Sequence, residues 1–157
     1  MSTPNRATTF LEEQHVPFET LAHRESFTSQ GVAAACHVSG WNLAKVLLIH
    51  DPQGPPFVVV MPASCRLDIA ELRRRTGRTL LTLAREEEMK GLFPDCEPGA
   101  LPPFGNLYGL PVFVDACFPR GQELIFQPGN HHEAVRIKYE DFERLARPIL
   151  TDVCCCH

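Results

Sequence analysis

The sequence has no hydrophobic run close to the roughly 20 residues that a membrane-spanning helix needs. Its longest apolar runs lie near Val46–Ile49 and Phe57–Met61, so we expect no membrane association. The chain begins without a basic stretch followed by an apolar one, which predicts no secretory signal and a cytoplasmic location. Repeats, low-complexity segments and internal linkers are also missing. With 157 residues and 44% hydrophobic content, the chain can form one domain with a substantial core.

Positive charge is in deficit, since 15 Lys and Arg residues face 19 Asp and Glu residues, for a net charge of −4. This balance excludes a protein that coats nucleic acid through general charge, although it allows contact through a local basic patch. Residues 66–85 form such a stretch, with six arginines and two acids, Asp68 and Glu71. A solvated helix face is the ordinary explanation for such arginines. The alternative is a phosphate-binding surface, with these candidates: Arg73, Arg74, Arg75 and Arg78.

Paired cysteine spacing is absent, because none of the seven cysteines belongs to a Cys-x-x-Cys motif. An odd cysteine count favours a reducing compartment over a disulfide framework, and the spacing does not predict a zinc site. The sequence ends in Cys154-Cys-Cys-His157, which has the composition of a chelating tail. Adjacent residues are poorly placed to complete a tetrahedral shell, and chain ends are often frayed. We therefore expect residues 151–157 to be a short disordered tail without a metal; the competing hypothesis is a small metal-binding protein built on this tail.

Predicted strands fall in hairpin-like groups, with helices between them and at the ends of the chain. The apolar runs 43–50 and 57–61, joined by a Pro/Gly turn, are typical of a central hairpin. Thr28 is a candidate N-cap for a helix through Val38, and Asp68 with Glu71 forms a capping box. Other strands are predicted at 18–21, 80–83, 112–115, 123–126 and 134–138, and other helices within 1–15, at 85–92 and around Phe142, Leu145, Ala146 and Ile149. These elements predict one α+β domain over residues 1–150, with a mixed, largely antiparallel sheet curled toward a barrel and flanking helices.

Lys45 is one of three lysines in the chain and lies among apolar residues at the start of a predicted core strand. Burial of an ammonium group costs free energy unless the group is paired or its pKa falls, so a lysine at this position requires a reason. The alternative is a lysine at a strand edge that extends its charged end into water. The position of Lys45 in the sequence supports a functional role and a structural role equally.

Two turn segments combine rigidity with exposed polar groups. The first is Gly99-Ala-Leu-Pro-Pro-Phe-Gly105, whose glycines let a ligand approach the backbone and whose N–H groups can hold a carbonyl oxygen. The second is Pro128-Gly-Asn-His-His-Glu133, which lies between two predicted strands. Adjacent histidines on a strand point to opposite faces, so at most one of them is expected to face a given pocket.

These three features, in this order and spacing, resemble the YbaK/prolyl-tRNA-synthetase-associated domain family. The residues that carry the resemblance are Lys45 at the head of a core strand, the Gly99-x-x-x-Pro103-x-Gly105 loop and the Gly129-Asn-His131 turn. The resemblance covers about residues 12–150. It implies a YbaK-like fold and an aminoacyl-tRNA deacylase that removes a wrong amino acid from a tRNA 3′ end, related to the editing domain of prolyl-tRNA synthetase.

The resemblance also implies the roles of individual residues. Lys45 is the residue expected to carry activity, as a general base or as an electrostatic anchor. The substrate-binding residues are expected to be Gly99, Pro103, Gly105, Gly129, Asn130 and His131. No Ser-His-Asp or Cys-His arrangement indicates a covalent intermediate, so water is the expected nucleophile and no cofactor is expected.

The expected substrate is tRNA-Pro carrying a small amino acid such as alanine or cysteine. The expected partners are the aminoacyl-tRNA 3′ end and prolyl-tRNA synthetase, and the expected state is a monomer or weak homodimer. The alternative is a catalytically silent module that binds tRNA or a synthetase and regulates or recruits it. Turnover of a mischarged tRNA separates the two hypotheses.

Overall fold

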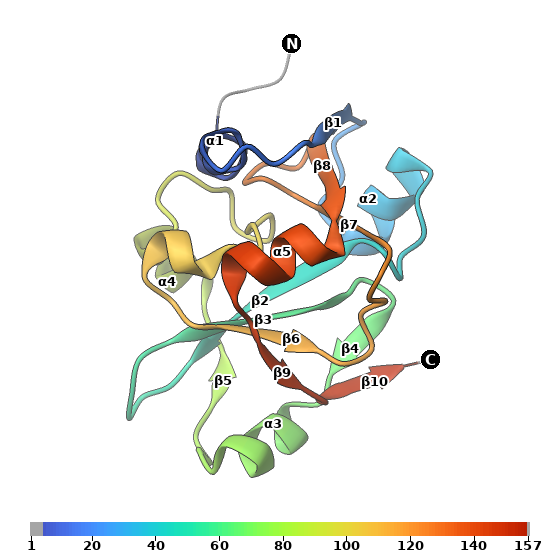
Figure 1. Cartoon of the computed structure of the whole chain (residues 1–157). Coiled ribbons are helices and arrows are strands. Elements are labelled where there is room, and N and C mark those ends of the chain that lie inside the picture. Colours follow the sequence, from blue (N-terminus) through green and yellow to red (C-terminus); the bar gives the residue numbers. More distant parts are fainter. Residues whose placement is uncertain (1–4, 157) are drawn as a thin grey trace.

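The computed structural model describes residues 5–156, with side chains as far as Cys154. It confirms the predicted α+β class, with helices arranged around mixed sheets (Figure 1). The elements in chain order are α1 (Arg6–Glu13), β1 (Glu19–Ala22), α2 (Ser29–Cys36), β2 (Ala44–His50), β3 (Phe57–Pro62), β4 (Cys65–Leu67), α3 (Ile69–Thr76), β5 (Thr82–Leu83), α4 (Glu86–Leu92), the 3₁₀ helix η1 (Gly105–Tyr108), β6 (Val112–Asp115), β7 (Glu123–Phe126), β8 (Glu133–Lys138), α5 (Tyr139–Ala146), β9 (Ile149–Thr151) and β10 (Cys154–Cys156).

The predicted central hairpin is confirmed as β2 and β3, which pair antiparallel from Ala44 opposite Pro62 to Ile49 opposite Phe57. Every residue of β3 is buried, as its β-branched run suggests for a strand covered on both faces. The sheet that contains this hairpin has the order β5-β2-β3-β6-β9. Its last two pairings, β3 with β6 and β6 with β9, are parallel, so the sheet is mixed.

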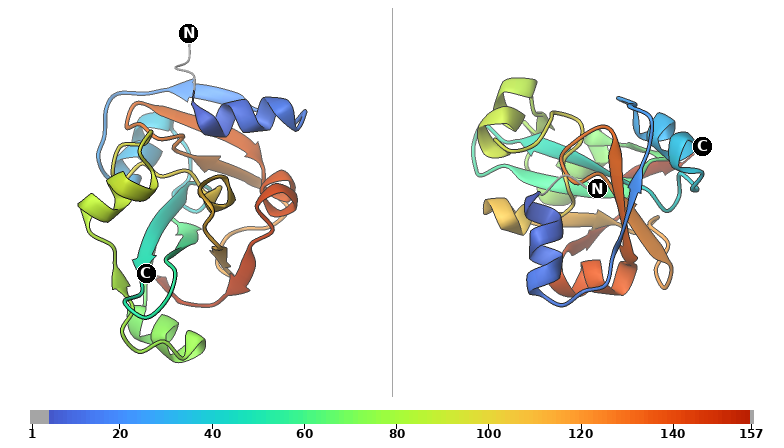
Figure 2. Two further views of the ribbon diagram at one scale, coloured as in Figure 1. Left: turned by 90° about the vertical axis from the view of Figure 1, so that its left-hand side faces the viewer. Right: turned by 90° about the horizontal axis from the view of Figure 1, so that it is seen from above.

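A second sheet of order β1-β8-β7 is entirely antiparallel. A parallel bridge between Leu43 and Ile125 connects it to the first sheet. The main core contains side chains from both sheets, together with residues of α1 and α5 that close its sides (Figure 2). Phe104 lies at the centre of this core, with ring centroids 5.5 Å from Phe126 and 6.0 Å from Phe142. The residues of this core hold the Gly99–Gly105 loop in place.

Helix ends follow local signals in most cases. The Thr28 hydroxyl accepts the Gly31 N–H at 3.0 Å at the start of α2. The Asp68 carboxylate accepts the Glu71 N–H at 3.1 Å, which confirms Asp68 as the N-cap of α3. The reciprocal bond of a capping box is not formed, because the Asp68 N–H donates to the Val153 carbonyl and the Glu71 carboxylate pairs with arginines of α3. Two predicted ends differ from the structure. Helix α2 ends at Cys36, because His37 adopts a left-handed conformation, whereas the prediction continues the helix through Val38.

The last helix ends earlier than predicted. Arg147 adopts a left-handed conformation with φ of 48°, and the proline that follows it cannot continue a helix. Ile149 therefore lies in β9 with 55% of its surface exposed, and the prediction that places it on the apolar face of the helix is wrong.

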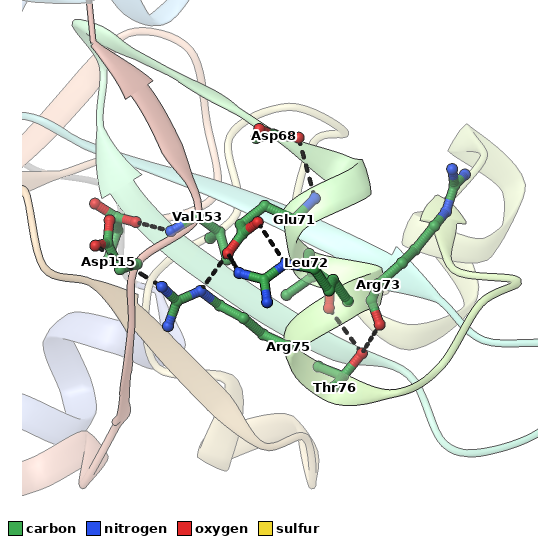
Figure 3. Close-up of polar contacts among 10 residues, drawn as sticks. Asp68, Glu71, Leu72, Arg73, Arg75, Thr76, Asp115 and Val153 are labelled. Carbon is green, nitrogen blue, oxygen red and sulfur yellow. Dashed lines mark hydrogen bonds and ion pairs between the residues drawn. The ribbon is translucent and has the colours of Figure 1, made fainter.

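The C-terminal residues differ from the predicted disordered tail, because Cys154–Cys156 form β10 and pair antiparallel with β4. Val153 fills a second core on the other face of the main sheet and is 1% exposed. Its N–H donates to a carboxylate oxygen of Asp115 at 2.8 Å (Figure 3). Its carbonyl accepts the Asp68 N–H at 2.7 Å. This segment is ordered by its pairing with β4 and by the burial of Val153. Both depend on residues distant in the sequence, so local composition does not predict them.

Among the described residues, the helices are all too short or too polar to cross a membrane.

Candidate functional site

The alternation of β2 places Lys45 on a different face of the sheet from the main core. Ala44 and Leu48 point into the main core, whereas Leu47 and Ile49 pack into the second core. Lys45 shares the face of Leu47, because side chains two residues apart on a strand point the same way. It is half-buried, and its ammonium group donates a hydrogen bond to the carbonyl oxygen of Cys65.

Burial lowers the pKa of Lys45 from its ordinary value. The thiols of Cys65 and Cys154 act in the opposite direction, and the positive charge of Arg66 lowers the pKa further. A half-buried amine with this many charged or polarisable neighbours differs from a strand-edge lysine that only extends into water.

Lys45 lines a surface depression of about 660 Å³. The other lining residues are Gln30, Ala63, Ser64, Cys65 and Arg66. The Gln30 amide donates to the Ala63 carbonyl at 3.1 Å and so joins α2 to the end of the central hairpin. Sequence reasoning did not identify Gln30 or Ser64 as site residues. No local motif marks them, because only the fold brings α2 against the turn after β3.

The Gly99–Gly105 loop has different roles at its two ends. Gly99 has φ of 85°, and a side-chain carbon there would lie 3.6 Å from Cε1 of the His131 ring. Gly105 faces the main core instead, where an added carbon would lie 2.9 Å from Cγ2 of Val58. Pro103 is buried beside it. The structure thus places Gly99 against His131 of the Gly129–His131 turn, while the absence of a side chain at Gly105 lets the loop pack closely on Val58.

His131 is 4% exposed, and its polar contacts define its tautomer. Its Nε2 lies 3.0 Å from the carbonyl oxygen of Pro98. A carbonyl only accepts hydrogen bonds, so Nε2 carries a proton, and in the neutral ring Nδ1 is then an acceptor. Nδ1 is buried and has no hydrogen-bond partner among the described residues. The ring of Phe27, which is 71% exposed, lies on His131 with a centroid distance of 4.8 Å.

Glu97 connects the Gly129–His131 turn to the Gly99–Gly105 loop through hydrogen bonds. Its carboxylate accepts the His131 N–H at 2.9 Å, and its own N–H donates to the Gly129 carbonyl at 2.7 Å. Gly129 has φ of 122°, and an added carbon there would lie 3.1 Å from the Cys96 sulfur, so this position requires glycine. Sequence reasoning did not assign a role to Glu97.

Asn130 shapes the turn through its own side chain. Its carbonyl oxygen accepts the N–H groups of His132 at 3.0 Å and Glu133 at 2.8 Å, and its amide donates to the Glu133 carboxylate at 3.0 Å. An Asx turn of this kind positions neighbouring residues. The adjacent His132 has an exposed side chain, in line with the expectation that one histidine of the pair faces inward.

The structure therefore brings Gly99, Gly129 and His131 into one group, while Lys45 lines a separate surface depression. The segment that begins α2 connects the two. Phe27 contacts His131, and three residues later Gln30 lines the Lys45 depression. The Ser26 N–H also donates to the His131 carbonyl at 3.1 Å.

The candidate phosphate-binding arginines all have partners within the chain. Glu71 pairs with both Arg74 and Arg75, and Figure 3 shows Arg75 beside Glu71 on α3. Arg73 donates to the Leu81 carbonyl at 2.9 Å. Arg78 pairs at 2.9 Å with the buried carboxylate of Asp51. These contacts account for part of the basic stretch, although Arg74 remains 70% exposed.

Solved structures of low sequence identity share this fold. The hypothetical protein APE2540 is 20% identical, with a TM-score of 0.83 over 95% of this chain and 99% of that chain. A proposed trans-editing enzyme for prolyl-tRNA synthetase is 21% identical, with a TM-score of 0.83 over 98% of each chain. A proposed signal-transduction protein from Marinobacter aquaeolei VT8 is 19% identical, with a TM-score of 0.73 over 98% of this chain and 31% of that chain. No curated protein sequence matches the chain.

The model of the aminoacyl-tRNA editing domain matches residues 23–145. This range includes Lys45, the Gly99–Gly105 loop and the Gly129–His131 turn. The chain belongs to the aminoacyl-tRNA editing domain family, of the YbaK type, as its sequence motifs predict.

Proposed function

We propose that this protein hydrolyses the ester bond of a mischarged tRNA in trans, with tRNA-Pro carrying alanine or cysteine as the substrate. Membership of the editing-domain family supports the reaction class. The fold shared with a proposed trans-editing enzyme for prolyl-tRNA synthetase supports the choice of tRNA. The observation that carries the proposal is the position of Lys45, half-buried at an open depression beside the start of α2.

Three neighbouring groups near the start of α2 suit the end of an aminoacyl-tRNA. The exposed ring of Phe27 provides a stacking surface for the terminal adenine. Buried Nδ1 of His131 is an acceptor without a partner among the described residues, and it can receive a hydrogen bond from the amino group or a ribose hydroxyl. Gly99 leaves room for the aminoacyl group to approach the backbone.

Lys45 acts as a positioning cation in this mechanism. An ammonium group has three N–H donors, so the bond to the Cys65 carbonyl leaves two for the substrate. These donors hold the ester carbonyl oxygen or the terminal phosphate, and backbone N–H groups of the Gly99–Gly105 loop assist as charge develops. Water attacks the carbonyl carbon, the bond to the ribose oxygen breaks, and that oxygen receives a proton. The products are the amino acid and tRNA with its terminal hydroxyl restored.

A panel of charged tRNAs tests the function directly. The protein is mixed with tRNA-Pro carrying alanine, cysteine, serine, threonine or proline, and release of the amino acid is followed over time. We expect turnover of the alanyl or cysteinyl ester and little hydrolysis of the prolyl ester. Binding of tRNA without hydrolysis of any ester would contradict the proposal and support the silent binding module.

The arginines of α3 are proposed to contact tRNA phosphates beyond the 3′ end, with Arg73, Arg74 and Arg75 as the contact residues. Their substitution together by alanine is expected to weaken tRNA binding and to make log affinity less dependent on log salt concentration, by about 0.7–0.9 for each lost contact. Binding measured at several salt concentrations tests this. An unchanged affinity and slope would mean that these arginines only solvate the helix and pair with Glu71.

A further inference from the structure

Three cysteines that are distant in the sequence meet in the fold. Cys65 lies in β4, Cys117 follows β6 and Cys154 lies in β10. Their sulfur atoms all lie within 4.8 Å of one another. Cys65 is buried, while Cys117 and Cys154 are half-buried, so solvent reaches part of the group. The function proposed above does not use these thiols.

The surrounding backbone fixes the positions of the three cysteines. Asp115, which is 1% exposed, accepts the Cys117 N–H at 2.8 Å with one carboxylate oxygen. Its other oxygen accepts the Val153 N–H at 2.8 Å and so positions the residue before Cys154 (Figure 3). The pairing of β10 with β4 places Cys154 opposite Leu67 and next to the strand that carries Cys65. A buried carboxylate that holds two of the three cysteine-bearing segments resembles the outer-shell support of metal sites.

We propose that Cys65, Cys117 and Cys154 bind one thiophilic divalent cation, Zn²⁺. In a tetrahedral zinc site the Zn–S distance of about 2.3 Å places sulfur atoms about 3.8 Å apart, so these sulfurs need to approach by no more than about 1 Å. Each thiol gives its proton to solvent as it ligates the metal. Water or another donor completes the fourth position.

The local charges suit this site. Three thiolates around Zn²⁺ carry a net charge of −1, and two cations lie nearby. The ammonium of Lys45 interacts electrostatically with Cys65 and Cys154, and Arg66 is the residue after Cys65. A positive environment stabilises thiolates. A disulfide would use two of the three sulfurs, whereas a metal ion accounts for the convergence of all three.

Zinc binding by the full-length reduced protein tests the proposal. The protein is stripped with a chelator, kept reduced, and titrated with ZnCl₂ against a chromophoric competitor. We expect one zinc per chain and an increase in Tm when zinc is added. Cobalt(II) in place of zinc is expected to give the intense thiolate-to-metal charge-transfer absorption of a site with several sulfur ligands. These measurements on the unmodified protein do not depend on any variant or on deacylase activity.

Variants then identify the ligands. Cys117→Ser and Cys154→Ser are each expected to weaken zinc affinity about 100-fold or more, since even the loss of an outer-shell partner costs about 10–100-fold. Cys36→Ser is the matched control, because Cys36 is also half-buried but lies on α2 outside the cluster, and it is expected to bind zinc like the unmodified protein. Circular dichroism verifies that each variant is folded.

Several results would overturn the proposal. The reduced, folded protein could bind no zinc, or the Cys117 and Cys154 variants could bind zinc as tightly as the Cys36 variant. A disulfide between two of the three cysteines, together with no metal uptake after reduction, would assign the cluster to redox chemistry instead.

Discussion

His131 has a buried ring nitrogen that has no hydrogen-bond partner in the part of the chain that the structure describes. Nε2, the backbone N–H and the backbone carbonyl of His131 all have partners. Nδ1 is buried without one among the described residues. A buried acceptor without a partner costs about 1–3 kcal/mol, and a ligand that donates a hydrogen bond to it recovers part of that cost. This supports a binding role for His131.

Substitution of His131 is therefore expected to impair activity more than substitution of its neighbour. His131→Ala should lower kcat/KM for the mischarged tRNA by about 10–100-fold, the loss expected when one buried hydrogen bond to the substrate is removed. His132→Ala is the matched control, because the His132 side chain is exposed, and it should change kcat/KM by less than about twofold. Equal effects of the two substitutions would contradict the assigned role of His131.

Burial of the Cys96 thiol is expected to slow its alkylation. Burial raises the pKa of the Cys96 thiol from 9.0 to about 11. The thiolate is the reactive form, so a raised pKa lowers its population at pH 8 and slows alkylation. The shift predicts alkylation about 100-fold slower than that of a model thiol at the same pH, with the rate increasing until the pH passes about 11.

Peptide mass spectrometry after timed alkylation of the native protein measures this rate. The denatured protein is the control, because Cys96 should then react like the model thiol. Rapid alkylation of Cys96 in the native state at pH 8 would show that the thiol is not shielded as the structure indicates.

At the scale of elements, local sequence was sufficient where the decisive interactions are local. The N-caps at Asp68 and Thr28 and the central hairpin are confirmed because each depends on residues that are close in the sequence. The apolar periodicity predicts a helix through Ile149, whereas a left-handed Arg147 and the proline that follows it end α5 earlier. Pro148 is visible in the sequence, and its effect on the backbone decides the helix end even though the apolar periodicity continues past it.

Long-range pairings were beyond the reach of sequence reasoning. The motif order predicts Lys45, Gly99 and His131 as site residues, but the contacts made by Gln30, Glu97 and Phe27 depend on how separate elements pack. The strand β10 was predicted as a disordered tail because its composition gives no sign of the edge provided by β4. The convergence of three cysteines arises from the same pairing, without a spacing motif.

The Asp115 carboxylate connects the turn after β6 to the segment before β10, and its substitution should show how much these hydrogen bonds contribute to stability. Asp115→Asn replaces one of the two carboxylate oxygens that accept the N–H groups of Cys117 and Val153 with a donor. The buried mismatch is expected to lower the free energy of unfolding by about 1–3 kcal/mol, measured by urea denaturation. Asp152→Asn, at a side chain that is 65% exposed, should have an effect of less than about 0.5 kcal/mol. A similar result for the two variants would mean that Asp115 does not hold the C-terminal segment.

At the scale of the whole molecule, a net charge of −4 is compatible with an editing function if recognition is confined to the 3′ end. General attraction to the tRNA backbone is weak at this charge, so binding is expected to be transient and salt-sensitive only through a few contacts. Selectivity among amino acids then depends on the pocket. One methyl group changes the binding free energy by only about 1–3 kcal/mol, so the pocket can discriminate only modestly between amino acids that differ by one methyl group.

Deacylation by this protein is proposed to depend on the Lys45 ammonium group. Single-turnover hydrolysis of alanyl-tRNA-Pro by the unmodified protein, Lys45→Ala and Lys90→Ala measures this dependence. Lys90 is the matched control, because it lies on α4 with a 63% exposed side chain. We expect Lys45→Ala to lower the rate at least about 100-fold with the fold intact by circular dichroism, and Lys90→Ala to retain full activity. Full activity of a folded Lys45→Ala variant would contradict the account.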